Sequence, residues 1–467
     1  MTTEILARIQ FAFTVAYHYI YPPLSIGLGL LLVSYLGAFL KTKDGDYQVL
    51  AKFWTKIFAL TFGIGVVTGI VMEFEFGTNW ATYSRYVGDI FGSALAAEGI
   101  FAFALESGFL GVLLFGWNRV SPKVHFISAL GVFLGSMFSA VWIVIANSWQ
   151  QTPAGYHIVG EGLKARAEIT DFWAMVFNPS SVERLSHVWI GAILAGAFLV
   201  ISVHAYYLLQ KKFIRLSKKA LKPAIIIAAL GSLLQLFTGH ISAEGVAKNQ
   251  PAKLAALEGH YQTGPADLYL FGWVNQETQE VFGPKIPGGL SLLLHHDTTT
   301  EVIGLNHFKK EDRPIQINAI FQFYHLMVGI GMALIGLSFL GVIELLRGKL
   351  FDNKLLLKLF VPAVILPQLA NQFGWFAAEM GRQPWVVYNL LKTSDAFSKN
   401  VSANQILFSL ILFFIVYTVL FILFIYLLNK KIKKGPAGDD FDGGDVSYTV
   451  TKEITDILID ANSSEKA

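Results

Sequence analysis

The chain has no cysteine among its 467 residues. This absence excludes disulfides, thiolate metal sites, iron–sulfur clusters and covalently attached c-type haem, and it leaves histidine, methionine and carboxylates as metal ligands. Charge is also scarce, because only 15% of the residues are Asp, Glu, Lys or Arg and the net charge is +3. So small a charge, carried mostly by short loops, favours no nucleic-acid partner.

Apolar residues are abundant: they make up 54% of the chain, aromatic residues 14%, and the mean hydropathy is +0.51. This composition is too apolar for an ordinary soluble protein and indicates a chain that lies in a lipid membrane. A membrane span needs about 20 apolar residues, and about nine segments satisfy this length. They are centred near Leu28, Gly65, Phe103, Leu134, Ala195, Ala228, Gly331, Ile365 and Ile415. We predict an all-α fold, a polytopic helical bundle of about nine transmembrane helices.

Basic residues follow alternate spans. They are Lys41, Lys43, Lys52 and Lys56 after the first, Arg119 and Lys123 after the third, Lys211, Lys212, Arg215, Lys218, Lys219 and Lys222 after the fifth, Arg347, Lys349, Lys354 and Lys358 after the seventh, and Lys430, Lys431, Lys433 and Lys434 after the ninth. Cytoplasmic loops are typically the basic ones. The pattern therefore predicts an external N-terminus and a cytoplasmic C-terminus.

The spans and connections divide the chain into four parts. Residues 1–241 hold the first six spans, and residues 316–434 hold the last three. The long polar connection 242–315 lies on the outer side and is expected to bind a ligand, because structureless loops of that length are uncommon unless they are functional. The tail 435–467 lacks an apolar period and is expected to be flexible, apart from a short helix near Ile454.

Five polar or sulfur-containing residues inside the spans share one depth. His18, Glu98, His187, Met327 and Glu379 all fall in the half nearer the outer face on this topology. Ionisable residues at membrane depth are costly and usually face a bundle interior or a cofactor. Ligands of cofactors that are stacked near one face must share a depth, whereas scattered structural residues need not.

The ligand types fit iron. A histidine and a methionine on different helices can hold one haem from both faces, and we assign His187 and Met327 to this role. His18, Glu98 and Glu379 are candidates for haem sites with an open face. Each residue also has a purely structural explanation: a lone intramembrane histidine is often only hydrogen-bonded, and methionine commonly fills gaps in a core.

Glu106 lies two turns further along the helix that carries Glu98, on roughly the same side. With Ser139 in the fourth span it is placed to relay protons inward, although a neutral buried carboxyl bonded to a neighbour is the alternative. His204, His240 and His325 are weaker candidates, which we expect to be hydrogen-bonding residues.

Several motifs together resemble one known family, subunit I of the cytochrome bd-type quinol oxidases. They are Gln10–His18, Ala97–Glu98 with Glu106, Trp142–Trp149, Ser186–His187, Gln250–Gly259, Met327–Gly329 and Glu379–Trp385. The match covers nearly the whole transmembrane chain. The combination of the sixth-to-seventh-span loop motif with the last motif is specific.

The resemblance implies a low-spin haem b held by His187 and Met327, together with a high-spin haem b and a haem d. His18 and Glu379 match the ligands of the high-spin pair, with Glu98 close by, but the sequence does not say which residue serves which ring. Arg382 is placed to pair with haem propionates. Asn147, which lies in the Trp142–Trp149 motif, and Trp375, one turn before Glu379, are expected to contact a cofactor.

The loop motif carries the expected substrate site. Lys253 and Glu258 match the quinol-binding loop of the family, whereas their spacing alone favours a solvated ion pair. The resemblance further implies oxidation of quinol at the outer face and electrogenic reduction of dioxygen to water with cytoplasmic protons. It implies a bacterial inner-membrane location, a second large subunit and often a small single-helix subunit.

Two departures limit the resemblance. His325 stands where family members often have Arg or Lys, so we expect the potential of the low-spin haem to depend on pH. The loop is of the shorter kind, and it leaves the choice between ubiquinol and menaquinol open.

Other functions compete with this reading. A haem-free proton-coupled transporter would explain Glu98, Glu106 and Glu379, but not the His187 and Met327 pair, and no symmetry between halves is visible. A haem-containing electron conduit that never meets oxygen is also compatible with that pair. A copper oxidase is less attractive, because the histidines form no accessible cluster.

Overall fold

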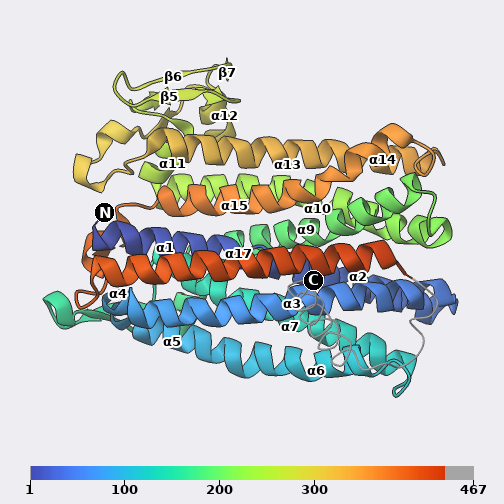
Figure 1. Ribbon diagram of the computed structural model, residues 1–467. Coiled ribbons are helices and arrows are strands. Elements are labelled where there is room, and N and C mark those ends of the chain that lie inside the picture. The colour runs from blue at the N-terminus through green and yellow to red at the C-terminus, as the bar shows by residue number, and fades with distance from the viewer. Residues whose placement is uncertain (1, 437–467) are drawn as a thin grey trace, which may run out of the picture.

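The computed structural model describes residues 2–436 and shows a bundle of long, roughly parallel helices (Figure 1). Within the described residues, nine segments are long and apolar enough to span a membrane, which confirms the predicted count and the helical class. These segments are Thr3–Thr42, Gly45–Thr78, Gly88–Phe115, Pro122–Gln151, Ser181–Leu209, Ile214–Asn249, Lys310–Leu346, Lys354–Met380 and Ala403–Lys434. The predicted short helix near Ile454 lies outside the described residues.

The elements follow one another along the chain with few long connections. The helices are α1 (Thr3–His18), α2 (Tyr21–Thr42), α3 (Gly45–Thr78), α4 (Ala81–Tyr86), α5 (Gly88–Ala97), the π-helical turn η1 (Glu98–Phe103), α6 (Ala104–Phe115), α7 (Pro122–Gln151), α8 (Phe172–Val176), α9 (Ser181–Leu209), α10 (Ile214–Asn249), α11 (Pro251–Glu258), α12 (Gly289–His295), α13 (Ile317–Leu346), α14 (Lys354–Phe360), α15 (Ile365–Met380), α16 (Thr393–Ala396) and α17 (Ala403–Lys434), with short 3₁₀ turns at Gly162–Lys164, Leu305–His307, Lys310–Asp312 and Pro362–Val364.

Short antiparallel strand pairs lie in the connections and not in the spans. They are β1 (Tyr156–Val159) with β2 (Arg166–Ile169), β3 (Gly264–Pro265) with β8 (Glu301–Val302), β4 (Leu268–Tyr269) with β7 (Lys285–Ile286), β5 (Trp273–Asn275) with β6 (Glu280–Phe282), and β9 (Trp385–Val387) with β10 (Leu391–Lys392). The bundle itself is therefore all-α.

The two ends of the bundle differ in what they carry. One end holds the N-terminus, α11 and the strands β3 to β8, and we call it the site end (Figure 1). The other end, the basic end, holds the helix ends at Thr42, Leu209, Leu346 and Lys434. The sequence placed five candidate residues in the same half of the membrane. In the structure all five lie in the half of their spans nearer the site end: His18, Glu98, His187, Met327 and Glu379.

The first span is broken beside His18. Pro22 and Pro23 lie in the first turn of α2 and have no N–H, so they cannot bond to carbonyls of the preceding turn, and α1 ends at His18. The predicted position of His18 early in the span was wrong, because α1 starts at Thr3 and His18 lies near the middle of a 40-residue segment.

The central core forms where α2 and α9 pack closely. A Cβ atom at Gly196 would lie 2.3 Å from the Gly27 carbonyl carbon, so both positions need glycine for the backbones to approach. Around this crossing, Leu28, Leu31 and Phe198 are fully buried. The crossing holds α9, which carries His187, at the centre of the bundle.

The long connection is folded and begins later than predicted. Helix α10 continues to Asn249, past the predicted boundary at Ser242, because its hydrogen-bonded turns run on at the site end. Beyond it, α11 and the β5–β6 pair cover the adjoining end of α13, whereas α12 and the β3–β8 pair pack beside α10 and α11. The connection that we expected to bind a ligand is therefore a small structured unit over two apolar clusters.

Candidate functional site

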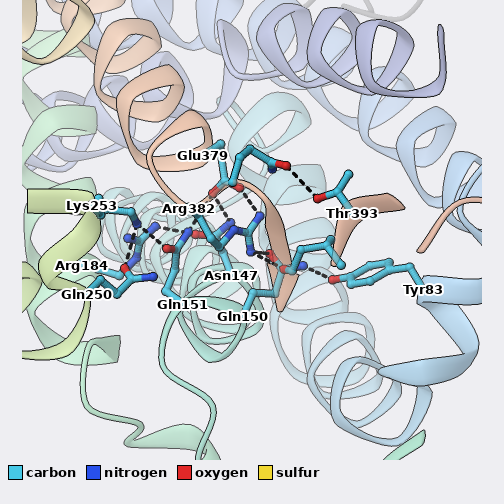
Figure 2. Close-up of polar contacts among 12 residues, drawn as sticks. Tyr83, Asn147, Gln150, Gln151, Arg184, Gln250, Lys253, Glu379, Arg382 and Thr393 are labelled. Atoms are coloured by element: carbon cyan, nitrogen blue, oxygen red, sulfur yellow. Dashed lines mark hydrogen bonds and ion pairs between the residues drawn. The ribbon is translucent and has the colours of Figure 1, made fainter. Parts of the chain in front are cut away.

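Glu379 lies at the centre of a buried polar network near the site end of α15 (Figure 2). Its Oε1 accepts hydrogen bonds from Asn147 Nδ2 at 3.1 Å and from Gln151 Nε2 at 3.2 Å, both on α7. Its Oε2 forms an ion pair with the Arg382 guanidinium. Arg184, on α9, donates to Asn147 Oδ1 at 2.6 Å. The acid that stood out in the sequence is thus held directly by two side chains of α7 and by Arg382, and indirectly, through Asn147, by Arg184 of α9.

Lys253 on α11 completes this group. Its Nζ donates to Gln250 Oε1 at 2.8 Å and to Gln151, which in turn contacts Glu379. We call Asn147, Gln151, Arg184, Lys253, Glu379 and Arg382 the Glu379 cluster. It contains three cationic side chains and one carboxylate, and Lys253 is only 2% exposed. Burial, with repulsion from Arg184, lowers the pKa of Lys253 well below its usual value, although Glu379 opposes the shift.

Arg382 also fixes the chain that follows α15. Its Nη1 donates to Gln150 Oε1 and to the Val386 carbonyl, each at 2.7 Å. Gln150 contacts the Tyr83 hydroxyl (Figure 2). Arg382 is 5% exposed, and both of its Nη atoms donate to protein acceptors. Its Nε has no hydrogen-bond partner within residues 2–436. Arg382 therefore links α15 to the residues around β9.

Two histidines are oriented by threonine hydroxyls. His187 Nδ1 lies 3.1 Å from Thr238 Oγ1, and His18 Nδ1 lies 2.9 Å from Thr68 Oγ1. Both hydroxyls give their proton to a carbonyl of their own helix, so each accepts one from its histidine. Nε2 is then the nitrogen with the lone pair on each ring, the form in which imidazole binds a metal.

His18, His187 and Met327, which carry imidazole nitrogen or thioether sulfur, each face a glycine on a neighbouring helix. A Cβ at Gly69 would lie 3.2 Å from His18 Cε1, and one at Gly239 would lie 3.5 Å from His187 Cε1. A Cβ at Gly374 would lie 2.7 Å from Met327 Sδ. The absence of a side chain at these positions lets the helices approach the donor atoms closely.

Glu98 and Glu106 both point towards α7. Ser139 Oγ donates to Glu98 Oε1 at 2.5 Å, and Ser136 donates to Glu106. The sequence paired Glu106 with Ser139, but the structure places Ser139 beside Glu98, and Ser136, which the sequence missed, beside Glu106. It also missed the π-helical turn η1, which begins at Glu98 and replaces the regular α-helical rotation between the two acids. Wide turns of this kind are frequent at functional sites.

Glu258 is separated from Lys253, although both lie on α11. Gly259, with φ +64°, ends the helix directly after Glu258, which is 1% exposed. Glu258, whose two carboxyl oxygens are buried, is one of the residues that line a pocket of about 480 Å³, together with His260, Asp267, Glu280 and Lys285. Burial raises the pKa of Glu258 to about 8, against an opposing effect of Tyr324. The expected quinol-binding pair thus faces two different regions.

The weaker candidates have structural partners. His204 accepts from Trp54 Nε1 at 3.2 Å and lies 3.1 Å from Ser217 Oγ, and His240 pairs with Glu244 at 3.4 Å. His325 bonds to the carbonyl oxygens of Phe321 at 2.9 Å and Tyr269 at 3.0 Å. Trp375 is half-buried on α15, with its ring 5.4 Å from Phe376. Within residues 2–436, no three His, Asp or Glu side chains gather as a metal site.

Sequence reasoning missed several members of the site. Arg184 lies one turn before His187, and Gln150 and Gln151 follow the Trp142–Trp149 motif, so their positions beside matched residues were the available signal. Thr68, Ser136 and Thr238 carried no such signal. Hydroxyl residues are common in membrane helices, and only the packing of α1, α9 and α7 against their neighbours brings these side chains to His18, His187 and Glu106.

The fold and the site define a class: a multi-pass helical membrane protein in which buried acids and oriented histidines gather in one half of the bundle. Residues 6–436 match the family described as cytochrome bd terminal oxidase subunit I. The chain belongs to this family and is a subunit of a multi-subunit respiratory oxidase.

Known relatives cover almost the whole chain. The chain is 37% identical over 452 residues to the cytochrome bd ubiquinol oxidase subunit 1 of Bacillus subtilis (strain 168), covering 94% of this chain and 96% of the relative. It is 33% identical over 499 residues to the cytochrome bd-II ubiquinol oxidase subunit 1 of Escherichia coli (strain K12), covering 92% and 96%. The structure of the bd oxidase from Geobacillus thermodenitrificans aligns with a TM-score of 0.87 and 29% identity, over 93% of this chain and 99% of that one.

The family implies haem cofactors, and the donor residues fit them. His18, His187 and Met327 supply the nitrogen and sulfur donors that haem iron takes, and each has a glycine beside it. Buried polar atoms near these residues, including Gln235 Oε1, Gln372 Oε1 and Asn371 Nδ2, have no protein partner. The donor types and these polar atoms suit a bound group with both apolar and polar edges.

Proposed function

We propose that the chain is the haem-bearing subunit of a quinol oxidase that takes electrons from quinol at the site end and delivers them to dioxygen. The observation that carries this proposal is the pair of oriented histidines with Met327, in a chain of the cytochrome bd family. The bound haems would supply electron transfer and oxygen reduction. The two curated relatives named above are ubiquinol oxidases, and we extend quinol oxidation from them to this chain.

His187 and Met327 would hold the low-spin haem b through Nε2 and Sδ. His18, Glu98 and Glu379 would serve the high-spin haem b and the haem d, without an assignment of each residue to one ring. Arg382 and Arg184 would neutralise propionates, since the two guanidinium groups outnumber the single carboxylate of the Glu379 cluster. Trp375 and Asn147 would contact the same cofactors.

Glu258 would take the proton that quinol releases on oxidation. It is buried beside a pocket that also contains the solvent-facing groups Asp267 and Lys285, so a proton held on its carboxyl has a route outward. Lys253 would act from the opposite face of α11, by polarising a quinone oxygen. The pKa of about 8 lets Glu258 hold a proton near neutral pH.

Protons from the basic end would reach the oxygen-reducing site along α6 and α7. Glu106 with Ser136, and Glu98 with Ser139, form two successive carboxyl–hydroxyl pairs between these helices. The route would draw protons from the cytoplasm and make turnover electrogenic. This direction requires the site end to face outwards in the bacterial inner membrane.

Quinol-dependent oxygen consumption by the purified complex tests the proposal. The complex would contain this chain, subunit II and, where present, a small single-helix subunit. We expect consumption by the wild type, and a large loss in Glu106→Ala with haem content retained. A wild type that consumes no oxygen with any quinol contradicts the oxidase, whereas full activity in Glu106→Ala contradicts only the relay. The transporter alternative would instead show proton-coupled uptake without haem.

A further inference from the structure

A second group of buried polar residues lies between α1, α3 and α17, away from the Glu379 cluster. Glu75, near the site end of α3, is 2% exposed, and its Oε2 accepts a hydrogen bond from Thr14 Oγ1 at 2.9 Å. One turn before Thr14, Gln10 Oε1 accepts from Asn79 Nδ2 and from Ser409 Oγ, each at 3.1 Å. These contacts form a polar line that starts at the site end.

Three tyrosines continue this line towards the middle of the bundle. The ring of Tyr17 stacks on Tyr417 of α17 at 4.4 Å and meets Tyr21 edge-on at 5.5 Å. All three side chains are at least nine-tenths buried. We call Gln10, Thr14, Tyr17, Tyr21, Glu75 and Tyr417 the Glu75 track. It lies along α1 on the approach to His18.

Four polar atoms of the Glu75 track form no hydrogen bond of regular geometry among the described residues, although two of them, the Tyr17 and Tyr21 hydroxyls, lie beside each other. They are the hydroxyls of Tyr17, Tyr21 and Tyr417, and Glu75 Oε1. A buried hydroxyl without a partner destabilises a protein, and phenylalanine would fill the same space without that penalty. Four such atoms in one contiguous group therefore point to a polar ligand small enough to enter between packed rings.

We propose that the Glu75 track binds a chain of ordered water molecules that connects the level of His18 with the site end. Buried waters typically bond to about three polar groups that lack other partners, and hydroxyls and carboxylates are suitable ones. Gln10, Asn79 and Ser409 continue the polar path beyond Glu75 to the end of the bundle.

The proposed water chain gives protons a route through the bundle. Hydrogen-bonded lines of hydroxyl, carboxyl and water carry protons, because each group can accept one proton as it gives up another. The track uses α1, α3 and α17, so it is separate from the carboxyl–hydroxyl pairs on α6 and α7. Its proton conduction, unlike its water binding, rests on the proposed oxidase function.

Removal of one hydroxyl tests the water binding directly. Tyr417→Phe in the purified complex keeps the stacked ring and loses only the hydroxyl. If water is bound, the wild type shows ordered density beside Tyr417 and Glu75 at high resolution, and the variant has a lower Tm. Tyr426→Phe, which is 49% exposed on the same helix, is the matched control with an unchanged Tm. A dry track, with a higher Tm in Tyr417→Phe, overturns the proposal.

Glu75→Gln tests conduction while preserving shape. We expect slower oxygen consumption, a larger ratio of the rates in H₂O and D₂O, and an unchanged haem spectrum. Unchanged rates in both solvents reject conduction. If the complex carries no haem at all, the oxidase assignment fails, but the density and Tm measurements still decide whether the track binds water.

Discussion

The threonine contacts of His18 and His187 set the chemistry of both rings. Because Thr68 and Thr238 give their own protons to helix carbonyls, each must accept from Nδ1, which fixes the tautomer with the lone pair on Nε2. In His187 this lone pair accepts a hydrogen bond from Gln235 Nε2 at 2.9 Å, which a metal at Nε2 would have to displace. Hydrogen bonds of this kind hold a metal-binding histidine in its productive orientation. Two residues on separate helices have acquired the same arrangement.

Ionisation of Glu258 should make both the stability of the protein and its kcat/KM depend on pH. Its folded pKa of about 8 lies above the usual 4.5, so the folded protein holds the proton more tightly. Its contribution to stability is present below about pH 4.5 and is lost as pH rises through about 8. Activity should change with pH in the opposite direction to stability. Only the ionised carboxylate accepts a proton from quinol, so kcat/KM should rise as the pH rises towards 8.

Replacing Glu258 with glutamine isolates the contribution of its carboxyl group to activity. Glu258→Gln should lower kcat/KM for quinol by about 100-fold and abolish the rising limb of the pH profile, because the amide accepts no proton. Glu277→Gln, at an exposed position of the same connection, is the control and should resemble the wild type. An unchanged profile in Glu258→Gln would show that another group accepts the proton.

The identities of the site residues were largely predictable, but their contacts were not. Glu379 was recognisable as a charge in an apolar helix, and Arg382 lay one turn away in the sequence. Lys253 and Glu258 lie five residues apart on one short helix, and no spacing rule shows that one side chain reaches Gln151 while the other lines the pocket. Those contacts depend on how α11 packs against α7 and α13.

Local breaks in the helices position the functional side chains. The prolines after His18 end α1, and the π-helical turn begins at Glu98. Apolar periodicity located both spans, because the breaks do not interrupt the apolar character. It could not locate the π turn, which depends on one extra residue per turn and leaves no compositional mark.

The contact between α13 and α15 depends on a single glycine. A Cβ at Gly374 would lie 2.7 Å from Met327 Sδ, so Gly374→Ala must displace the thioether. We expect a weaker or shifted low-spin haem signal while the protein remains folded. Gly329→Ala, on α13 with no atom within 4 Å of the added methyl, should leave the spectrum unchanged. Identical spectra for both variants would argue against Met327 as a ligand.

Within residues 2–436 the nine apolar spans follow one another as predicted, and the lack of cysteine allows a clean test of their orientation in the membrane. Glu277→Cys lies in the connection at the site end, and Lys349→Cys lies at the basic end; both positions are exposed. In intact cells, a membrane-impermeant thiol reagent should label Glu277→Cys, and it should label Lys349→Cys only after the membrane is opened. The reverse pattern would invert the topology and the proposed direction of proton uptake.

The central claim is that this bundle holds haem through His187 and Met327. A reduced-minus-oxidised absorption spectrum of the purified complex, recorded for the wild type and for Met327→Leu, tests it most directly. The wild type should show b-type and d-type bands, and Met327→Leu should lose or alter the low-spin b signal while it keeps the others. A wild type without haem bands, or a low-spin signal that is unaltered in Met327→Leu, would contradict the account.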